Sequence, residues 1–526
     1  MTVAARSRHL AVVVALALAR PQAKAWAVAE APLSLDDAVT RALEKNERIV
    51  VERESLTAAD AGISGAQGAY DLTLQTSAGW QHATRPVNST FSGAPEGELA
   101  PTISEADVSA SLSKLLSSGA TLSMRASTVR DSTNSSFSLL SPAYGADLGV
   151  ELRQPLLRGR AIDQARLRVR QAAAERDQAR AALKREVANI VAAVERAYWA
   201  LAAVRLEVGV REEAVRLADD QLGETRIRIE KGIAPESEIA QPQAEFERRR
   251  GDLFATRQAL SRADAVLKLL ILGDDEVAAW NMPLVPTDAI AVDPAPVDAE
   301  AAMARALASR AELDEAEAVL AGRKAEADSA ADERKPALDL VVSYDRLALR
   351  GANNPLATGA AGGPAAIPPD LEGGWGGSLA TLFDGPYDDF RAGLDLTVPL
   401  GNRAARAAAI AAQSVQHQAE AQLRSQRKAV RAEVLDAVAA LETTAQRIAA
   451  AVAGSEAAQV QLMAERERYA VGLSTNFLVL TRQNDLSRAG LDEISARADY
   501  RRARTELARV TGSILEDRRI DIAPVR

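Results

Sequence analysis

The sequence predicts a mainly α-helical protein in which long helical hairpins and short β-strands occur twice along the chain. Three observations indicate this fold class: a duplicated order of motifs, long stretches without proline, and short stretches in which apolar and polar residues alternate. Aromatic residues make up only 4% of the 526 residues, and the abundance of alanine, leucine, valine and arginine is typical of long helices. We therefore expect extended rods and not one globular core.

The composition excludes several classes of site. Without cysteine, the chain cannot form a disulfide, a thiolate metal site or a cysteine nucleophile. Its three histidines, His9, His82 and His417, stand far apart in the sequence, so a histidine-based triad or metal site is not expected. The formal net charge of −9 argues against a nucleic-acid partner, because phosphate binding needs clustered cations. We expect no enzyme activity, no catalytic residue, no metal and no cofactor.

Residues 1–27 have the pattern of a signal peptide. Arg6 and Arg8 precede an apolar run at 10–19, and Ala-Trp-Ala at 25–27 resembles a cleavage site. The apolar run is shorter than the ~20 residues of a membrane-spanning helix, and no longer run is expected elsewhere. Removal of this segment, which carries four cations and no acids, would change the net charge to −13. In an exported chain of this kind, any membrane crossing is expected to use β-strands.

The rest of the chain is predicted to be an internal duplication. The Arg-Ala-Leu motif at 41–43 recurs at 305–307. Gly232 and Ile233 recur as Gly472 and Leu473. The predicted units are a first repeat over 34–280, a proline- and aspartate-rich linker over 281–296, a second repeat over 297–515 and a short tail over 516–526.

Each repeat is expected to open with a capped helix, followed by strands. Ser34 and Asp298 stand at N-cap positions, and their helices are predicted to run to about residues 69 and 333. Alternating apolar and polar residues then predict strands within 70–153 and 337–398. The strands are expected to end and pass into helix at Pro155 and Pro399.

A long helical hairpin completes each repeat. Apolar residues at steps of three and four, with no proline, predict hairpins over 159–272 and 402–510. A single helix over 164–230 would extend about 100 Å at ~1.5 Å per residue, so it needs a partner of similar length. The predicted turns, or tips, lie at 228–237 and 468–477, where glycine ends one helix before the next begins.

The strands raise the question of how a barrel could close. Four to six strands in one chain are fewer than the eight of the smallest membrane barrels, and open edges in lipid would leave backbone groups unpaired. Three chains that each give four strands would form a twelve-stranded barrel continued by twelve helical rods. The alternative is a small soluble sheet on a periplasmic coiled-coil scaffold. The sequence does not decide whether the strand-like segment at 121–129 is part of the barrel wall or lies on the outside of the barrel.

Several motifs, in this order and duplicated, resemble the TolC-like outer-membrane efflux protein family over nearly the whole mature chain. They are Leu-Ser-Leu-Asp-Asp-Ala at 33–38, Gln-Pro-Leu-Leu-Arg-Gly at 154–159, Val-Pro-Leu-Gly-Asn-Arg at 398–403, Arg-x-x-x-Gly-Ile at 228–233 and Arg-Tyr-x-x-Gly-Leu-Ser at 468–474. The resemblance implies a homotrimer, with a twelve-stranded barrel in outer-membrane lipid and a helical tunnel through the periplasm.

The resemblance also implies partners and a function. The helical tips would meet a periplasmic adaptor protein that is coupled to an inner-membrane transporter. The channel would give substrates passive passage to the exterior in an efflux or type I secretion system. Drugs, metals and secreted proteins all remain open as substrates.

We consider two hypotheses for the function of the residues at and beside the tips. The first is adaptor docking, in which glycine makes the turn and leaves an apolar residue exposed; the plainer alternative is that these residues only cap helices. The docking residues are Arg228, Gly232, Ile233, Arg468, Gly472, Leu473 and Ser474.

The second hypothesis concerns a tunnel constriction beside the tips. Family members often place aspartates just beyond the second tip, whereas this chain has Leu478 and Thr481 there. Glu236, Glu238 or Asp485 would then supply an acidic ring in a trimer, although acids at a helix N-terminus are also favoured by its dipole. Tyr469 is expected to hydrogen-bond to Glu238 in the closed state.

Two further patterns are assigned to surface and loop. The three arginines at 248–250 are expected on a solvated helix face, since charges of both signs alternate around them. The glycine-rich stretch at 373–377 is expected in a loop and contains no complete phosphate-binding pattern.

Overall fold

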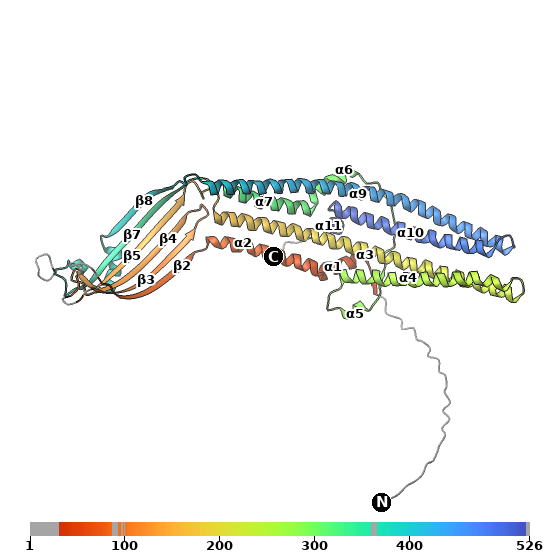
Figure 1. Cartoon of the computed structure of the whole chain (residues 1–526), viewed down its shortest axis with the longest axis horizontal. Helices are drawn as coiled ribbons and strands as arrows, with labels where there is room; N and C mark the ends of the chain where they lie inside the picture. The colour runs from red at the N-terminus through yellow and green to blue at the C-terminus, as the bar shows by residue number, and fades with distance from the viewer. Residues whose placement is uncertain (1–30, 87–92, 96–97, 99, 359–364, 522–526) are drawn as a thin grey trace, which may run out of the picture.

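The computed structural model describes residues 31–86, 93–95, 98, 100–358 and 365–521. The signal peptide expected at 1–27 lies outside the described residues and stays a prediction. The described chain is elongated, with a β-sheet at one end and helices packed along the rest (Figure 1). Long helical hairpins combined with antiparallel strands confirm the predicted fold class.

Each half of the chain opens with two helices separated by one extended residue. These are α1 (Leu35–Lys45) and α2 (Glu47–Gln67), then α6 (Ala299–Ser309) and α7 (Ala311–Asp332). One uninterrupted helix was expected in each place, but Asn46 and Arg310 have extended backbone with ψ of 119° and 123°. The Asn46 side chain accepts a hydrogen bond from the Arg48 amide and so caps α2. After the break, α2 packs against α3, and α7 packs against α3 and α9.

Two very long helices run through most of the molecule. They are α3 (Gln164–Glu230) and α9 (Arg403–Ala470), which return as α4 (Ala240–Ile271) and α10 (Asn476–Val510). Near the sheet, the helices lie side by side in the order α2, α3, α7 and α9; farther away the order is α4, α3, α10 and α9 (Figure 1). The molecule is therefore a layer four helices wide along its length. Two short helices, α5 (Val277–Trp280) and α11 (Ile514–Asp517), lie near its middle.

In the described part of the chain, α3 is the helix whose length and apolar composition would allow it to cross a membrane. No such run was expected after the signal segment. However, 67% of the apolar window in α3 is buried inside the structure, where Val191, Val194 and Leu201 form part of the main core. Buried core helices of soluble proteins have the same length and composition, so we assign α3 to the core.

Six of the described strands form one antiparallel sheet in the order β2-β3-β4-β5-β7-β8. They are β2 (Thr73–Thr84), β3 (Thr102–Leu115), β4 (Thr121–Thr133), β5 (Leu140–Pro155), β7 (Ala337–Asn353) and β8 (Asp388–Thr397). The segment at 121–129, which the sequence left unassigned, is part of β4 and pairs with β3 on one side and β5 on the other.

The sheet has one apolar and one polar face. Leu74 lies opposite Leu112, which in turn lies opposite Met124, and these side chains share one face. On the other face, the Ser77 and Ser109 hydroxyls are 2.7 Å apart. An apolar face that is largely exposed is unusual for a soluble sheet.

A helix covers part of this apolar face. The loop expected at 373–377 gives way at Trp375 to α8 (Trp375–Asp384), which follows the short 3-10 turn η3 (Pro369–Leu371). Leu382 of α8 packs against Ala146 and Ala348, and Arg346 of β7 donates a hydrogen bond to the Leu382 carbonyl at 2.9 Å. The helix was missed because four glycines surround its first residue.

A buried tyrosine joins the N-terminal segment and the linker to α3. Here β1 (Ala31–Leu33) pairs in parallel with β6 (Leu284–Pro286). The fully buried Tyr198 hydroxyl donates to the Asp288 carboxylate at 2.5 Å, accepts from the Thr287 amide at 3.1 Å and lies 3.0 Å from the Leu33 carbonyl oxygen. Burial and the hydrogen bond with Asp288 raise the pKa of Tyr198 to about 12.

Tyr198→Phe is expected to lower the free energy of unfolding by about 1–3 kcal/mol, because buried partners of the hydroxyl lose their hydrogen bonds. The measurement is the guanidinium unfolding midpoint, followed by far-UV circular dichroism. Tyr387→Phe is the matched control, since Tyr387 is exposed and should give no measurable shift. Equal midpoints for the two variants would contradict the role given to this tyrosine.

Candidate docking tips and tunnel constriction

The first tip ends α3 with a Schellman motif. Gly232 has a left-handed φ of +70°, its amide donates to the Ile229 carbonyl at 2.9 Å, and the Ile233 amide donates to the Arg228 carbonyl at 2.8 Å. The last carbonyls of the helix are thus satisfied by backbone amides. The Arg228 side chain is therefore available for another contact.

The second tip repeats this geometry. Gly472 has a φ of +80°, its amide donates to the Tyr469 carbonyl at 3.1 Å, and the Leu473 amide donates to the Arg468 carbonyl at 2.8 Å. Thr475 then caps α10 through its side chain. Both glycines thus occupy the position at which a left-handed backbone is needed.

Each tip presents an apolar side chain to solvent. Ile233 is 63% exposed and Leu473 is 79% exposed. Next to Leu473, Val471 is also exposed. Exposed apolar residues gathered in one place are typical of surfaces that contact other proteins. The exposure is thus consistent with the predicted adaptor docking, which stays a prediction.

The two tips are tied together within one chain by Arg228 and Tyr469. The guanidinium Nη1 of Arg228 donates to the Tyr469 hydroxyl at 2.9 Å, and its Cζ lies 5.3 Å from the ring centroid. The expected partner of Tyr469, Glu238, is not the one found here. Arg228 and Tyr469 are 241 residues apart, so local spacing gave no signal for this contact.

A second contact braces the turn of the second tip. The Ser474 hydroxyl donates to the nearly buried Glu465 carboxylate across the turn. Arg468 is exposed, and its guanidinium lies 3.9 Å from the same carboxylate. Ser474 therefore supports the shape of the tip, whereas Arg468 remains at the surface. Glu465 was missed because it lies on the helix before the turn, outside the tip motif.

The acidic candidates differ in their surroundings. Glu236 and Glu238 are exposed on the short 3-10 turn η2 (Glu236–Ile239). Asp485 accepts from Arg482 at 3.0 Å, one turn earlier on the same helix. A paired carboxylate presents less net charge than a solvated one. Within one chain, Glu236 and Glu238 are therefore the better candidates for an acidic ring.

The other two constriction candidates are neutral. The Leu478 side chain is partly exposed, and the Thr481 hydroxyl donates to the Phe477 carbonyl at 2.8 Å. Neither side chain can supply the charge of an acidic ring.

A buried arginine behind the tips joins three helices. Arg249 is only 3% exposed, so the expectation of a solvated face is wrong for the middle arginine of 248–250. Its guanidinium donates to Glu245 at 2.7 Å, to the Ala214 carbonyl of α3 at 2.9 Å and to Gln483 of α10 at 3.1 Å. Burial would raise the pKa of Glu245, but hydrogen bonds from Arg248 and Arg249 outweigh it and lower that pKa to about 2.

The strand-to-helix junctions lie at the other end of the helical layer. Pro155 is the last residue of β5, and Pro399 follows β8 after one residue. At the first junction, the Gly159 amide donates to Asp332 at 2.6 Å. At the second, the Asn402 amide group donates to the Arg334 carbonyl at 3.0 Å. The first junction is thus bonded to the last residue of α7, and the second to the turn that follows it.

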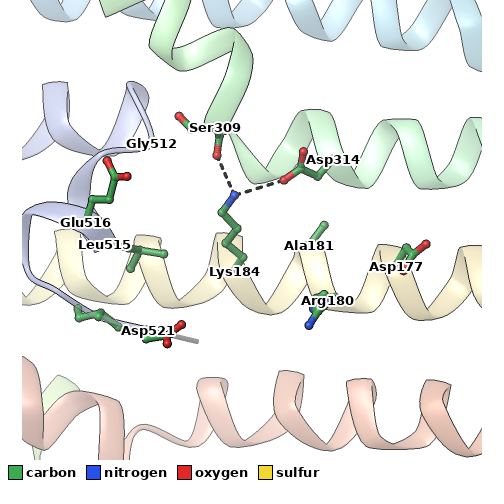
Figure 2. A pocket seen from close by; sticks show the side chains of 11 residues that line it. Asp177, Arg180, Ala181, Lys184, Ser309, Asp314, Gly512, Leu515, Glu516 and Asp521 are labelled. Carbon is green, nitrogen blue, oxygen red and sulfur yellow. Dashed lines mark hydrogen bonds and ion pairs between the residues drawn. The ribbon is translucent and has the colours of Figure 1, made fainter. Parts of the chain in front are cut away.

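A cavity of about 550 Å³ lies at mid-length between α3, the α6–α7 break and the C-terminal segment. In Figure 2, Lys184 reaches across it to the Ser309 carbonyl at 3.0 Å and to Asp314 at 3.3 Å. Its cation thus already has partners within the chain. No cluster of three metal-ligating side chains occurs in the described residues. We assign this cavity to packing between the two halves.

Comparison with known proteins identifies the architecture. Residues 302–513 match the family model described as outer membrane efflux protein. The CmeC outer membrane channel of Campylobacter jejuni superposes with a TM-score of 0.61 at 13% identity, over 91% of this chain and 85% of that chain. The resemblance to the TolC-like outer-membrane efflux proteins is confirmed.

Two further TolC-like structures give the same result. VceC of Vibrio cholerae matches with a TM-score of 0.60 at 15% identity, over 91% of this chain and 96% of that chain. The open state of the MtrE outer membrane channel of Neisseria gonorrhoeae matches with a TM-score of 0.59 at 16% identity, over 91% of this chain and 89% of that chain. No curated protein matches the sequence. These structural matches show that the chain has the fold of outer membrane channels, and the family match over residues 302–513 adds similarity to outer membrane efflux proteins.

Proposed function

We propose that this chain is one subunit of a trimeric outer-membrane channel that gives passive passage from the periplasm to the exterior. The observation that carries this proposal is the sheet itself, which is apolar on one face, polar on the other and open at both edges. Such a sheet is stable in lipid only when copies close it into a barrel.

The helical layer supports the same assembly. On one side of the layer, the outermost helices are α2, which exposes Val51, and α4, which exposes Leu269. On the other side, the outermost helix is α9, which exposes Leu435 and Val460. The open strands lie on the same two sides, since α2 leads into β2 and β8 leads into α9. Two different edges that meet head to tail generate a closed ring when the rotation between copies closes.

The tips would connect this ring to a periplasmic adaptor and an inner-membrane transporter. Exposed Ile233 and Leu473 would provide the apolar contact, and the glycine turns would hold it in place. The Arg228–Tyr469 contact would restrain the closed tunnel, and Glu236 and Glu238 of three chains would form its acidic ring. Efflux and type I secretion both fit this arrangement.

Cell fractionation tests the proposed function against the alternative of a periplasmic scaffold. The channel is expected in outer membranes, soluble only in detergent, and migrating as a trimer in SDS until it is boiled. A scaffold would be recovered from the periplasm without detergent and would migrate as one chain at every temperature. The second result would contradict the proposal.

Docking can be tested at the tip itself. A photo-crosslinking residue in place of Leu473 is expected to capture a periplasmic adaptor, identified by mass spectrometry. The same residue at Val277 is the matched control, because Val277 is also well exposed but lies near mid-length. Gly472→Val should reduce the yield severalfold, because a branched side chain is strained at φ +80° even though no atom lies within 4 Å of the new Cβ. Unchanged capture by this variant, with the trimer intact, would leave these residues as helix caps only.

A further inference from the structure

We propose that all six strands of each chain form the barrel wall, so that three copies build an eighteen-stranded barrel and not a twelve-stranded one. This inference rests on the proposed trimeric channel and specifies its pore. The partner surface is the strand edge of a second copy of this chain, with β2 of one copy beside β8 of the next.

The hydrogen-bonded ladder is continuous through β3 and β4, which are the two strands that a four-stranded share of the wall would leave out. Thirteen residue pairs join β3 to β4, eleven join β4 to β5, and twelve join β2 to β3. A twelve-stranded wall would need the β3–β4 hairpin to leave the sheet and β2 to pair with β5. That rearrangement would break the ladders on both sides of the hairpin.

The additional strands also have the two faces that a membrane wall requires. Val108 of β3 and Met124 of β4 are exposed on the apolar face. The register places Val150 and Tyr344 of the neighbouring strands on the same face. In a hairpin that lay in solvent, apolar and polar side chains would not need to alternate in register with those of the neighbouring strands.

Charges on the polar face connect β4 to two other strands. Arg125 donates to Asp147 of β5 at 3.0 Å and to Asp345 of β7 at 3.3 Å. The Ser127 hydroxyl also donates to Asp147. These contacts fix β4 within the wall and place its arginine toward the lumen of a closed barrel.

The width of the sheet fits the helices that continue it. Four helices spaced about 9 Å apart make a layer about 36 Å wide. Six strands spaced ~4.8 Å and tilted by about 40° span about 38 Å, whereas four would span about 25 Å. In Figure 1 the strands slant against the helix axes and spread across the layer. Six strands therefore meet four helices without a change in circumference.

The two edges suit each other. β2 has 12 residues and β8 has 10, and they are the shortest strands of the sheet. Beyond the end of β8, the edge of β7 is occupied by the bridge from Gly351 to Glu372 and by the bond from the Leu347 amide to the Tyr387 carbonyl. The open edge that remains on this side is thus close in length to the open edge of β2.

The consequence is a wide outer pore. Barrel diameter grows roughly linearly with strand number, so eighteen strands give about 1.5 times the diameter of twelve, in the range of water-filled porins. The barrel would then impose no size limit on a substrate that passes the tips. Selection would be confined to the tunnel constriction.

Cysteine labelling tests the wall directly, because the native chain contains no cysteine. In trimers reconstituted into liposomes, Val108→Cys should react only with a lipid-soluble maleimide, and Ser109→Cys should react with a small charged maleimide. Val150→Cys and Glu151→Cys on β5 are the matched pair and should behave in the same way. Reaction of both β3 variants with the charged reagent would place the hairpin outside the wall and overturn the inference.

A strand count by electron cryo-microscopy of the same trimers gives an independent result. Eighteen strands with β2 beside β8 of the next copy are expected. A trimeric pore with twelve strands would overturn this inference and leave the proposed function standing. Absence of any trimer in lipid would overturn both.

Discussion

Arg249→Met is expected to lower the free energy of unfolding by about 3 kcal/mol or more, since breaking a buried ion pair leaves its partners uncompensated. Methionine fills similar volume but donates no hydrogen bond, so the Ala214 carbonyl and Gln483 lose a partner. Glu245 still accepts a hydrogen bond from Arg248 at 2.6 Å in this variant. The expected loss of stability is therefore near ~3 kcal/mol and not far above it.

Guanidinium unfolding measures this change. The matched control is Arg250→Met, because Arg250 lies on the same turn, is only half-buried and pairs with Glu247 at 3.0 Å. Exposed pairs contribute at most about 1 kcal/mol, so the control midpoint should move little. Equal losses in both variants would show that burial of Arg249 does not stabilise the helices behind the tips.

The same cluster gives a pH dependence. The pKa of Glu245 is lowered from 4.5 to about 2 in the folded chain, so the carboxylate stabilises the fold above pH 4.5 and this contribution is lost as the pH falls toward 2. Glu245→Gln should flatten the unfolding free energy across this window relative to the native chain. An identical pH slope in both proteins would contradict the assignment.

Arg228→Ala is expected to shift the channel strongly toward its open state. The hydrogen bond to Tyr469 and the contact with its ring contribute about 1.5–2.5 kcal/mol per chain. Three copies would contribute roughly 4.5–7.5 kcal/mol, which changes the ratio of open to closed channels by a factor of about 10³ or more. The conductance of single channels in planar lipid should therefore rise.

The matched control for this variant is Arg226→Ala. Arg226 is a nearby exposed arginine that bonds to Gln243 of its own hairpin at 3.2 Å and does not join the two tips. Tyr469→Phe should reproduce part of the effect of Arg228→Ala, because the ring remains while the hydroxyl is lost. If Arg228→Ala and Arg226→Ala conduct alike, the tie between the tips does not restrain the tunnel.

Features with a local cause could be predicted from the sequence. The hairpin turns depend on a left-handed residue at the helix end, and glycine at 232 and 472 supplies it. The long helices follow from apolar spacing and the lack of proline, and the strands follow from alternation. In each case, the residues that determine the feature lie close to it in the sequence.

Features that depend on a distant partner could not be predicted. Arg248, Arg249 and Arg250 look alike in the sequence, and only the position of α10 decides that the middle one is buried. The contact between Arg228 and Tyr469 joins separate halves of the chain. For β4, alternation indicated a strand but could not give its neighbours, because register depends on both sides.

The central claim is that one chain is an incomplete wall and that copies of it enclose a pore. Planar lipid recording of the purified, detergent-solubilised protein tests this claim most directly. The account predicts discrete and uniform conductance steps from an SDS-resistant trimer, with larger steps for Arg228→Ala. A monodisperse monomer that stays in solution without detergent and adds no conductance to the bilayer would contradict it.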